Sequence, residues 1–162
     1  MCIRDSGIVE RFREHNQNTG IVLMGYTNPF EVYGYKAFAG RAQEAGVDGV
    51  LVVDMPPEAA NDLKSELDAV GIDFIFLVAP TTTNDRLKDI SKIATGYIYF
   101  VSLKGVTGAG NLDIDSVNHH LARMRNHIKL PVGVGFGIKN VKTAKQVSEN
   151  ADAVIVLSLI HI

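Results

Sequence analysis

The chain has 162 residues and a formal net charge of −2, with 46% hydrophobic and 21% charged residues. This size and composition are ordinary for one soluble domain, and the charge gives no reason to expect nucleic acid or an anionic membrane as partner. The single cysteine, Cys2, excludes an internal disulfide and a cysteine-rich zinc site. The apolar runs are shorter than the roughly 20 residues that a membrane helix needs. No secretory signal is recognisable, so the sequence predicts a cytoplasmic protein.

Six short runs rich in β-branched and aromatic residues recur along the chain and predict β-strands. Most of these runs are apolar throughout, which is typical of strands covered on both faces. The six predicted strands are Ile21–Met24, Gly49–Val53, Phe74–Val78, Tyr97–Val101, Val132–Val134 and Ala153–Val156.

Segments with helical spacing of apolar residues lie between these strands and predict five helices. Asn28, Pro29 and Glu31 predict a helix start, with Asn28 as the capping residue and Pro29 at the first helical position. Gly46 and Gly71 predict helix ends, because glycine accepts the left-handed conformation found there. Three apolar stripes carry the helix prediction: Tyr35, Phe38, Ala39 and Ala42; Ala60, Leu63, Leu67 and Val70; and Ile114, Val117, Leu121, Met124 and Ile128.

The alternation of strand and helix predicts a parallel sheet built from βα units. Gly46-Val47-Asp48 and Gly71-Ile72-Asp73 lead into successive strands, and their separation of roughly 25 residues suits one such unit. Two architectures are possible: an open doubly wound sheet, or part of a closed barrel. Length favours the open sheet, because a complete barrel usually needs about 250 residues. The loops after the strands favour the barrel.

Glycine-rich loops follow the fourth and fifth predicted strands, over residues 102–108 and 133–138. Ligands of parallel α/β proteins bind beyond the carboxyl ends of the strands, and glycines there let backbone N–H groups approach a phosphate. Plain tight turns would have the same composition. Neither loop has the spacing of the dinucleotide fingerprint or of the P-loop, which disfavours nucleotide binding.

Polar residues near the strand ends allow two interpretations each. Asp54 could be a catalytic carboxylate, but a cap on the following helix or an interface role is preferred for a single aspartate after a strand. Tyr26 and Tyr99 could line a site or only fill the top of a barrel.

The histidines do not predict a metal site. His119 and His120 lie in the middle of a predicted helix, where exposure to solvent is the expected environment. His15 and His127 have no partner at the spacing of metal ligands.

Several of these runs together resemble one family. Residues 23–29, 46–56, 76–82, 97–108 and 135–138 are similar, in order, to strands three to seven of the tryptophan synthase alpha chain and the loops after them. The resemblance extends from about residue 8 to residue 156. It implies an α/β fold, an incomplete (β/α)8 TIM barrel with parallel strands 3–8 and intervening helices, in one domain over residues 7–156. The ends, residues 1–6 and 157–162, fit no family pattern and are predicted to be extraneous.

The resemblance also implies a function in the last steps of tryptophan biosynthesis. Members of the family are lyases that cleave indole-3-glycerol phosphate to indole and glyceraldehyde 3-phosphate. The alpha chain needs no cofactor. Its partner in an alpha2beta2 complex is the beta chain, which holds pyridoxal phosphate and receives indole through a tunnel.

Residue by residue, the resemblance assigns ten positions of this chain. Tyr26 and Tyr99 would line the pocket for the indole and glycerol groups, with Leu51, Leu77 and Phe136 as its apolar walls. Gly108 and Gly137 would offer backbone N–H groups to the phosphate. Thr107 would belong to the loop that closes over the site and orients a catalytic aspartate. Asn28 and Asp54 would lie toward the beta chain.

The departures from the family pattern matter as much as the matches. The family's catalytic Glu and Asp lie on strand two and the loop after it, before the first matched residue. The Gly-Ser phosphate turn after strand eight is also missing, because Leu157 and Ser158 follow Val156. We therefore expect this chain to be inactive alone. We also expect it to be marginally stable or to aggregate through its two end strands.

Two alternative functions stay open from the sequence. One is another phosphate-binding barrel enzyme, which would require a strand-borne lysine or a carboxylate pair, and neither is seen on these strands. The other is a non-catalytic module that docks to the beta chain.

Overall fold

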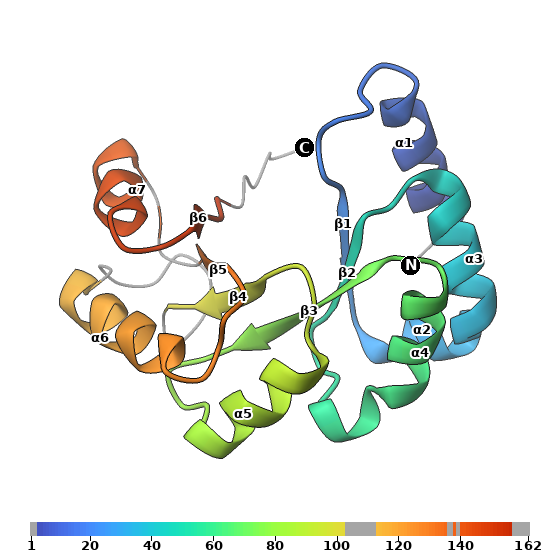
Figure 1. Cartoon of the computed structure of the whole chain (residues 1–162). Coiled ribbons are helices and arrows are strands. Elements are labelled where there is room, and N and C mark those ends of the chain that lie inside the picture. The colour runs from blue at the N-terminus through green and yellow to red at the C-terminus, as the bar shows by residue number, and fades with distance from the viewer. Residues whose placement is uncertain (1–2, 103–112, 136–137, 139, 157–162) are drawn as a thin grey trace. The chain divides into compact units, whose positions relative to one another are not determined.

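The six predicted strands are all confirmed, with ends that differ by at most two residues from the predicted ones. The structure is a computed structural model, and it describes residues 3–102, 113–135, 138 and 140–156. The strands are β1 (Val22–Gly25), β2 (Gly49–Val52), β3 (Asp73–Val78), β4 (Ile98–Val101), β5 (Val132–Gly135) and β6 (Ala153–Val154) (Figure 1).

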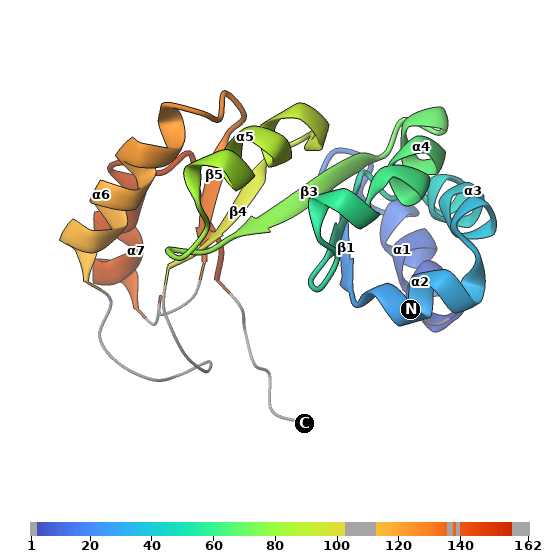
Figure 2. The same cartoon turned by 90° about the horizontal axis from the view of Figure 1, so that it is seen from below.

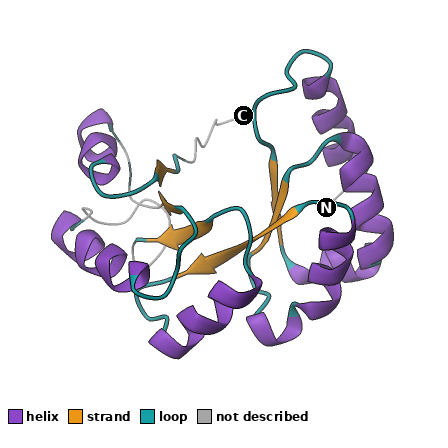
Figure 3. Ribbon diagram, viewed as in Figure 1, coloured by secondary structure: helices purple, strands orange, loops and turns teal. Residues whose placement is uncertain are grey.

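Helices separate every strand from the next, as Figure 3 shows. The helices are α1 (Ile3–Arg13), α2 (Thr27–Tyr33), α3 (Tyr35–Ala45), the short 3₁₀ helix η1 (Pro57–Ala59), α4 (Asn61–Ala69), α5 (Asn84–Ile93), α6 (Ile114–Arg125) and α7 (Val141–Ser148). Between β1 and β2 the chain forms two helices rather than one, because Gly34 at φ 84° interrupts the helical path. Helix α1 had no counterpart in the prediction. That residues 1–6 are extraneous stays a prediction.

Every described strand pairing is parallel, which confirms the βα organisation. The strand order is the chain order from β1 to β6. Met24 of β1 lies opposite Leu51 of β2, and Leu51 lies opposite Ile75 of β3. Tyr99 of β4 lies opposite Gly133 of β5. None of the helices in the described part of the chain is long and apolar enough to cross a membrane.

The chain divides into two compact units, each with its own core. The first comprises Met1–Phe76 with Ile93–Gly96, and the second comprises Leu77–Lys92 with Tyr97–Ile162. In the first unit, the predicted stripes of α3 and α4 face the core. The buried members of these stripes are Phe38, Ala39, Ala42, Ala60, Leu63 and Leu67. The ring of Phe30 meets that of Phe38 edge-on at 4.8 Å between centroids, a favourable geometry for two buried aromatic rings.

In the second unit, the predicted stripe of α6 is confirmed. Val117, Leu121 and Met124 are buried, as are Ile98 and Phe100 of β4. Helix α6 packs beside α7 (Figure 2). A helix that buries one stripe while leaving its other side in solvent is the expected cover for a strand with both faces apolar.

The helix ends confirm two glycine predictions and correct one capping prediction. Gly46 ends α3 in the left-handed conformation at φ 86°, and Gly71 has φ 73° just beyond α4. Helix α2 begins at Thr27, with Tyr26 at the N-cap and no side-chain cap bond from it. The prediction that Asn28 caps this helix is therefore wrong. Pro29 is the third helical residue, where a missing N–H costs no intrahelical bond.

Hydrogen bonds of an arginine and an aspartate connect the starts of β1 and β2. Asp48 precedes β2, and its Oδ2 accepts a hydrogen bond of 2.6 Å from the Ile21 amide and one from Arg13 Nη2. Arg13 Nε donates to the Gly46 carbonyl at 2.8 Å. We call this set the Arg13–Asp48 pair.

The same arrangement recurs at the starts of β5 and β6. Asp152 precedes β6, and its Oδ2 accepts bonds of 2.8 Å from the Val132 amide and 3.0 Å from Arg125 Nη2. Arg125 Nη2 also donates to the Asn150 carbonyl at 3.3 Å. In each set the arginine ends the helix before one strand, the aspartate precedes the next strand, and the carbonyl lies two residues before the aspartate. We call the second set the Arg125–Asp152 pair.

Candidate functional site

In the first unit, two of the residues assigned to the pocket share one face of the sheet. Successive side chains of a strand alternate between faces, so Tyr26, just beyond β1, lies on the face of Met24. Met24 lies opposite Leu51, which places Leu51 on that face too. Leu51 is 2% exposed, whereas Met24 and Tyr26 are 54% and 61% exposed. This face therefore carries the exposed side chains of Met24 and Tyr26 beside the buried Leu51.

Met24 is a candidate site residue that the sequence analysis missed. It was predicted only as part of a strand. The sequence does contain the signal, because residues two apart in a strand lie on the same face, and Met24 is two residues before Tyr26.

The loop after β1 is joined to the loop after β2 by Asp54. Asp54 Oδ1 accepts hydrogen bonds from the Thr27 amide at 2.7 Å and from Thr27 Oγ1 at 2.9 Å. These bonds lower the pKa of the Asp54 carboxyl below its ordinary value, the amide bond contributing most. Asp54 thus caps α2, the helix before it in the chain, and not the helix that follows. Sequence analysis could not predict this pair, because the two residues are 27 positions apart.

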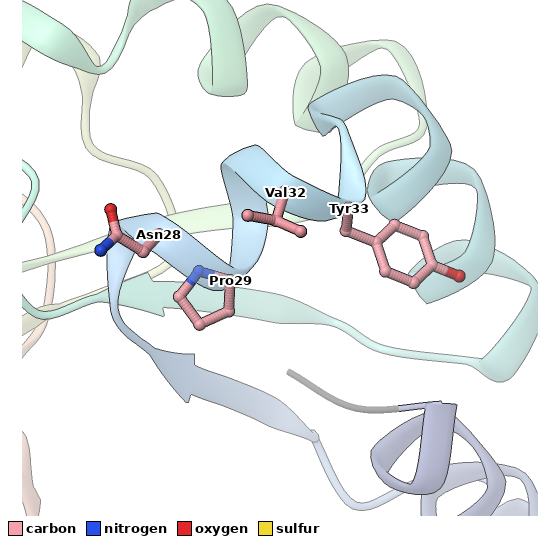
Figure 4. Close-up of a pocket in the computed structure, with 4 residues that line it drawn as sticks. All are labelled: Asn28, Pro29, Val32 and Tyr33. Carbon is pink, nitrogen blue, oxygen red and sulfur yellow. The ribbon is translucent and has the colours of Figure 1, made fainter.

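An open depression lies beside α2. It measures about 460 Å³ and is lined by Asn28, Pro29, Val32 and Tyr33 (Figure 4). Val32 is 90% exposed. Asn28, assigned by resemblance to the partner side, is therefore on an exposed and partly apolar surface.

In the second unit, Tyr99 packs against the backbone of Gly135. Tyr99 is 8% exposed. A Cβ atom on Gly135 would lie 2.2 Å from the Tyr99 hydroxyl oxygen, so the ring position requires glycine there. Burial raises the pKa of the Tyr99 hydroxyl, and the neighbouring Tyr97 raises it further. Tyr99 is accordingly a neutral phenol at physiological pH and can donate a hydrogen bond.

Ser102 joins the ends of β4 and β5 and was not singled out from the sequence. Its Oγ donates to the Gly135 carbonyl at 2.7 Å, and its amide donates to the same oxygen at 3.1 Å. A serine after a strand carries no specific signal, so only the fold reveals this role. Leu77 of β3, the other assigned wall residue of this unit, is half-buried.

The remaining assigned residues, Thr107, Gly108, Phe136 and Gly137, lie outside the described residues. Their roles stay predictions.

The two adjacent histidines of α6 differ. His119 is exposed, as predicted, whereas His120 is half-buried and its ring lies 5.9 Å from that of Phe100. Within residues 3–102, 113–135, 138 and 140–156, no group of three His, Cys, Asp or Glu side chains could hold a metal ion.

Comparison with known proteins decides the family. The sequence profile described as "Tryptophan synthase alpha chain" matches residues 6–161. The chain belongs to the tryptophan synthase alpha chain family. It is 63% identical over 153 residues to the tryptophan synthase alpha chain of Ruthia magnifica subsp. Calyptogena magnifica, covering 94% of this chain and 58% of that relative. It is 56% identical over 153 residues to that of Methylibium petroleiphilum, covering 94% of this chain and 56% of the relative.

Solved structures agree with the fold. The alpha subunit from Legionella pneumophila superposes with a TM-score of 0.85 at 41% identity, covering 94% of this chain and 55% of that one. A chain of the Pyrococcus furiosus tryptophan synthase a2b2 complex superposes with a TM-score of 0.84 at 38% identity, covering 96% of this chain and 63% of that one. The predicted fold class, an incomplete (β/α)8 barrel, is confirmed. The chain spans little more than half the length of the curated relatives that it matches.

Proposed function

We propose that this chain is the part of a tryptophan synthase alpha subunit that forms one wall of the site for indole-3-glycerol phosphate. The whole subunit would be a lyase that releases indole and glyceraldehyde 3-phosphate. The observation that carries the proposal is the 63% identity to a family member over 153 residues. The buried Tyr99 adds support, because its neutral phenol reaches Gly135, the last residue of β5, where it suits a polyhydroxylated substrate.

The side chains of this wall would bind and orient the substrate. Tyr26, Leu51 and Leu77 would contact the apolar indole ring, and Met24 adds to them by its place on the face of Leu51. Tyr99 would donate its hydroxyl proton in a hydrogen bond to the glycerol moiety. Outside the described residues, Phe136 would complete the apolar wall, Gly108 and Gly137 would bind the phosphate, and Thr107 would belong to the closing loop.

The same proposal predicts that the 162-residue polypeptide is inactive by itself. The family's Glu and Asp precede the region matched here, and a positioned acid or base contributes roughly 10²–10⁴-fold in rate. Binding and orientation by the wall residues alone would not replace such an acid or base.

We propose the beta chain as the partner that binds the exposed surface of α2. One similar solved chain is described as part of a tryptophan synthase a2b2 complex. Here Asn28 and the Thr27–Asp54 contact lie next to the depression lined by Pro29, Val32 and Tyr33. The alpha chain would need no cofactor, pyridoxal phosphate belonging to the beta chain, and the complex would work in the cytoplasm.

Turnover by a chimera tests the lyase assignment. The flanking segments of the Ruthia magnifica relative would be joined to residues 7–156, and indole release from indole-3-glycerol phosphate would be followed for the chimera and for the 162-residue chain. We expect release by the chimera and none by the chain alone. Tyr99→Ala in the chimera should reduce turnover, whereas the exposed Lys88→Ala should not. A folded chimera without lyase activity would contradict the assignment.

Docking without catalysis is the second candidate function, favoured by the open apolar surface of α2. Val32→Asp should weaken binding of the chain to a beta chain in a pull-down or by calorimetry. Val141→Asp is the matched control, because Val141 is 84% exposed on α7. Equal effects of the two variants would argue against docking at α2.

A further inference from the structure

Thr27 contacts Asp54 in two ways at once. Its amide and its hydroxyl both donate to the same carboxylate oxygen, at 2.7 and 2.9 Å. The amide is a helix-terminal donor that has no intrahelical acceptor. The hydroxyl could instead have turned to solvent, because Thr27 is only half-buried. The hydroxyl therefore points to Asp54 although it is free to point to solvent.

The two contacts join loops that the backbone also links. The Val53 amide donates to the Gly25 carbonyl at 2.9 Å, one residue before the Asp54 contact. Beyond that bond the strands end, and no further backbone bond between residues 26–28 and 54–56 exists in the described part of the chain. The side chains of Thr27 and Asp54 continue the connection past the last strand pair.

The Asp54 carboxylate is exposed, so hydrogen bonds rather than burial hold it in place. The causes that lower its pKa are the bonds from the Thr27 amide and hydroxyl, together with its own amide, and no charged side chain is among them. The bond from the Thr27 hydroxyl therefore contributes to the orientation of Asp54, and it can be removed without removing the bond from the amide.

We propose that Thr27 is a positioning residue, which holds the Asp54 carboxylate on the first turn of α2 and thereby fixes how Asn28 and Asp54 are presented. We call this set the Thr27–Asp54 bridge. That the presented surface meets a beta chain rests on the proposed function. The bridge itself does not, because it is a property of the free chain.

Two variants separate the hydroxyl from the shape of the side chain. Thr27→Val removes the hydroxyl and keeps the branched side chain, whereas Thr27→Ser keeps the hydroxyl. The pKa of Asp54 would be measured by carbon NMR of its carboxyl group in the 162-residue chain. We expect Thr27→Val to raise this pKa toward the ordinary carboxyl value and Thr27→Ser to leave it low. Thr83→Val is the control, because Thr83 lies at the start of α5 and accepts from the Arg86 amide.

Amide hydrogen exchange gives a second readout from the other side of the bridge. Asp54→Ala should speed exchange of the Thr27 amide by roughly two- to tenfold, the range for one net hydrogen bond. Exchange at the start of α5 should not change. An Asp54 pKa that is the same in Thr27→Val as in the unsubstituted chain would overturn the proposal. Equal shifts in Thr27→Ser and Thr27→Val would also overturn it.

Binding to a beta chain distinguishes the bridge from its proposed use. If the bridge positions the interface, Thr27→Val weakens binding and Thr27→Ser restores it. A chain that shows the expected pKa response but binds no beta chain would contradict the proposed docking and leave the bridge standing. A beta chain bound equally by both variants would contradict the positioning role at the interface.

Discussion

The Arg13–Asp48 pair and the Arg125–Asp152 pair use the same chemistry in different surroundings. Each aspartate accepts one backbone amide at the start of a strand or just before it, and one guanidinium N–H. Each arginine also donates to the carbonyl two residues before that aspartate. The side chain of Arg13 is 12% exposed, whereas that of Arg125 is 46% exposed. The two pairs therefore compare one interaction at two degrees of burial.

Burial also brings Arg13 more partners. Its Nη1 donates to the Thr19 carbonyl at 2.7 Å and to the Asn16 carbonyl at 3.3 Å, in the turn between α1 and β1. The planar guanidinium can satisfy several acceptors at once, which a flexible ammonium group cannot do equally well. An exposed ion pair contributes little because water competes for both partners. The comparison teaches that the carbonyls around the arginine, more than the ion pair, should decide its contribution to stability.

Removal of the Arg13 guanidinium should have the largest effect. Arg13→Met keeps an unbranched apolar side chain but leaves three carbonyls and Asp48 without this donor. We expect the free energy of unfolding to fall by about 2–3 kcal/mol, since the part-buried Gly46 and Asn16 carbonyls would each lose a bond at a cost of about 1–3 kcal/mol. Water can replace the donor at the exposed Thr19 carbonyl and Asp48. Urea unfolding followed by circular dichroism measures the change. Arg13→Lys should recover only part of it, and full recovery would show that charge alone matters.

Arg125→Met should have a smaller effect. Because Arg125 is nearly half-exposed, we expect a loss of about 0.5 kcal/mol, within the range of exposed ion pairs. The same urea titration applies. Arg41→Met serves as the control for an ion pair that lacks a strand amide, since Arg41 bonds Glu10 on the surface. A loss at Arg125 as large as that at Arg13 would refute the role of burial.

The smallest effect concerns pH. The pKa of Asp152 is lowered, first by the Val132 amide and then by Arg125. A lowered folded pKa stabilises the fold above the carboxyl's unfolded pKa, and this contribution is lost as pH falls through the folded pKa. Stability should therefore decline in acid below the ordinary carboxyl value of 3.8. Asp152→Asn should flatten this decline in unfolding midpoints measured from pH 5 to pH 2. An unchanged slope would mean that other carboxylates cause it.

Much of the fold could be predicted from the sequence because its signals are local. Runs such as Phe74–Val78 and the stripe at Leu63 and Leu67 are determined by burial of nearby residues, and the structure has them where expected. The split at Gly34 was missed because a single glycine in an apolar pattern does not reveal its φ angle. Helix α1 was missed because no stripe was recognised there.

The candidate site was predictable only where the family supplies a role. Tyr99 could be assigned by resemblance, but its contact with Gly135 depends on strand register between β4 and β5. The Thr27–Asp54 bridge and the bond from Ser102 to Gly135 join residues far apart in the chain. Such pairs are formed only in the tertiary fold, and the residue types alone do not predict them.

Binding of indole-3-glycerol phosphate to the 162-residue chain tests the central claim most directly. The chain contains no tryptophan, so the indole group of the ligand is the only indole fluorophore in the mixture. We predict a saturable change in its fluorescence with added chain, weakened by Tyr99→Ala and unaffected by Lys88→Ala. No saturable change with folded chain, or binding that is indifferent to Tyr99, would contradict the claim that this chain forms a wall of the substrate site.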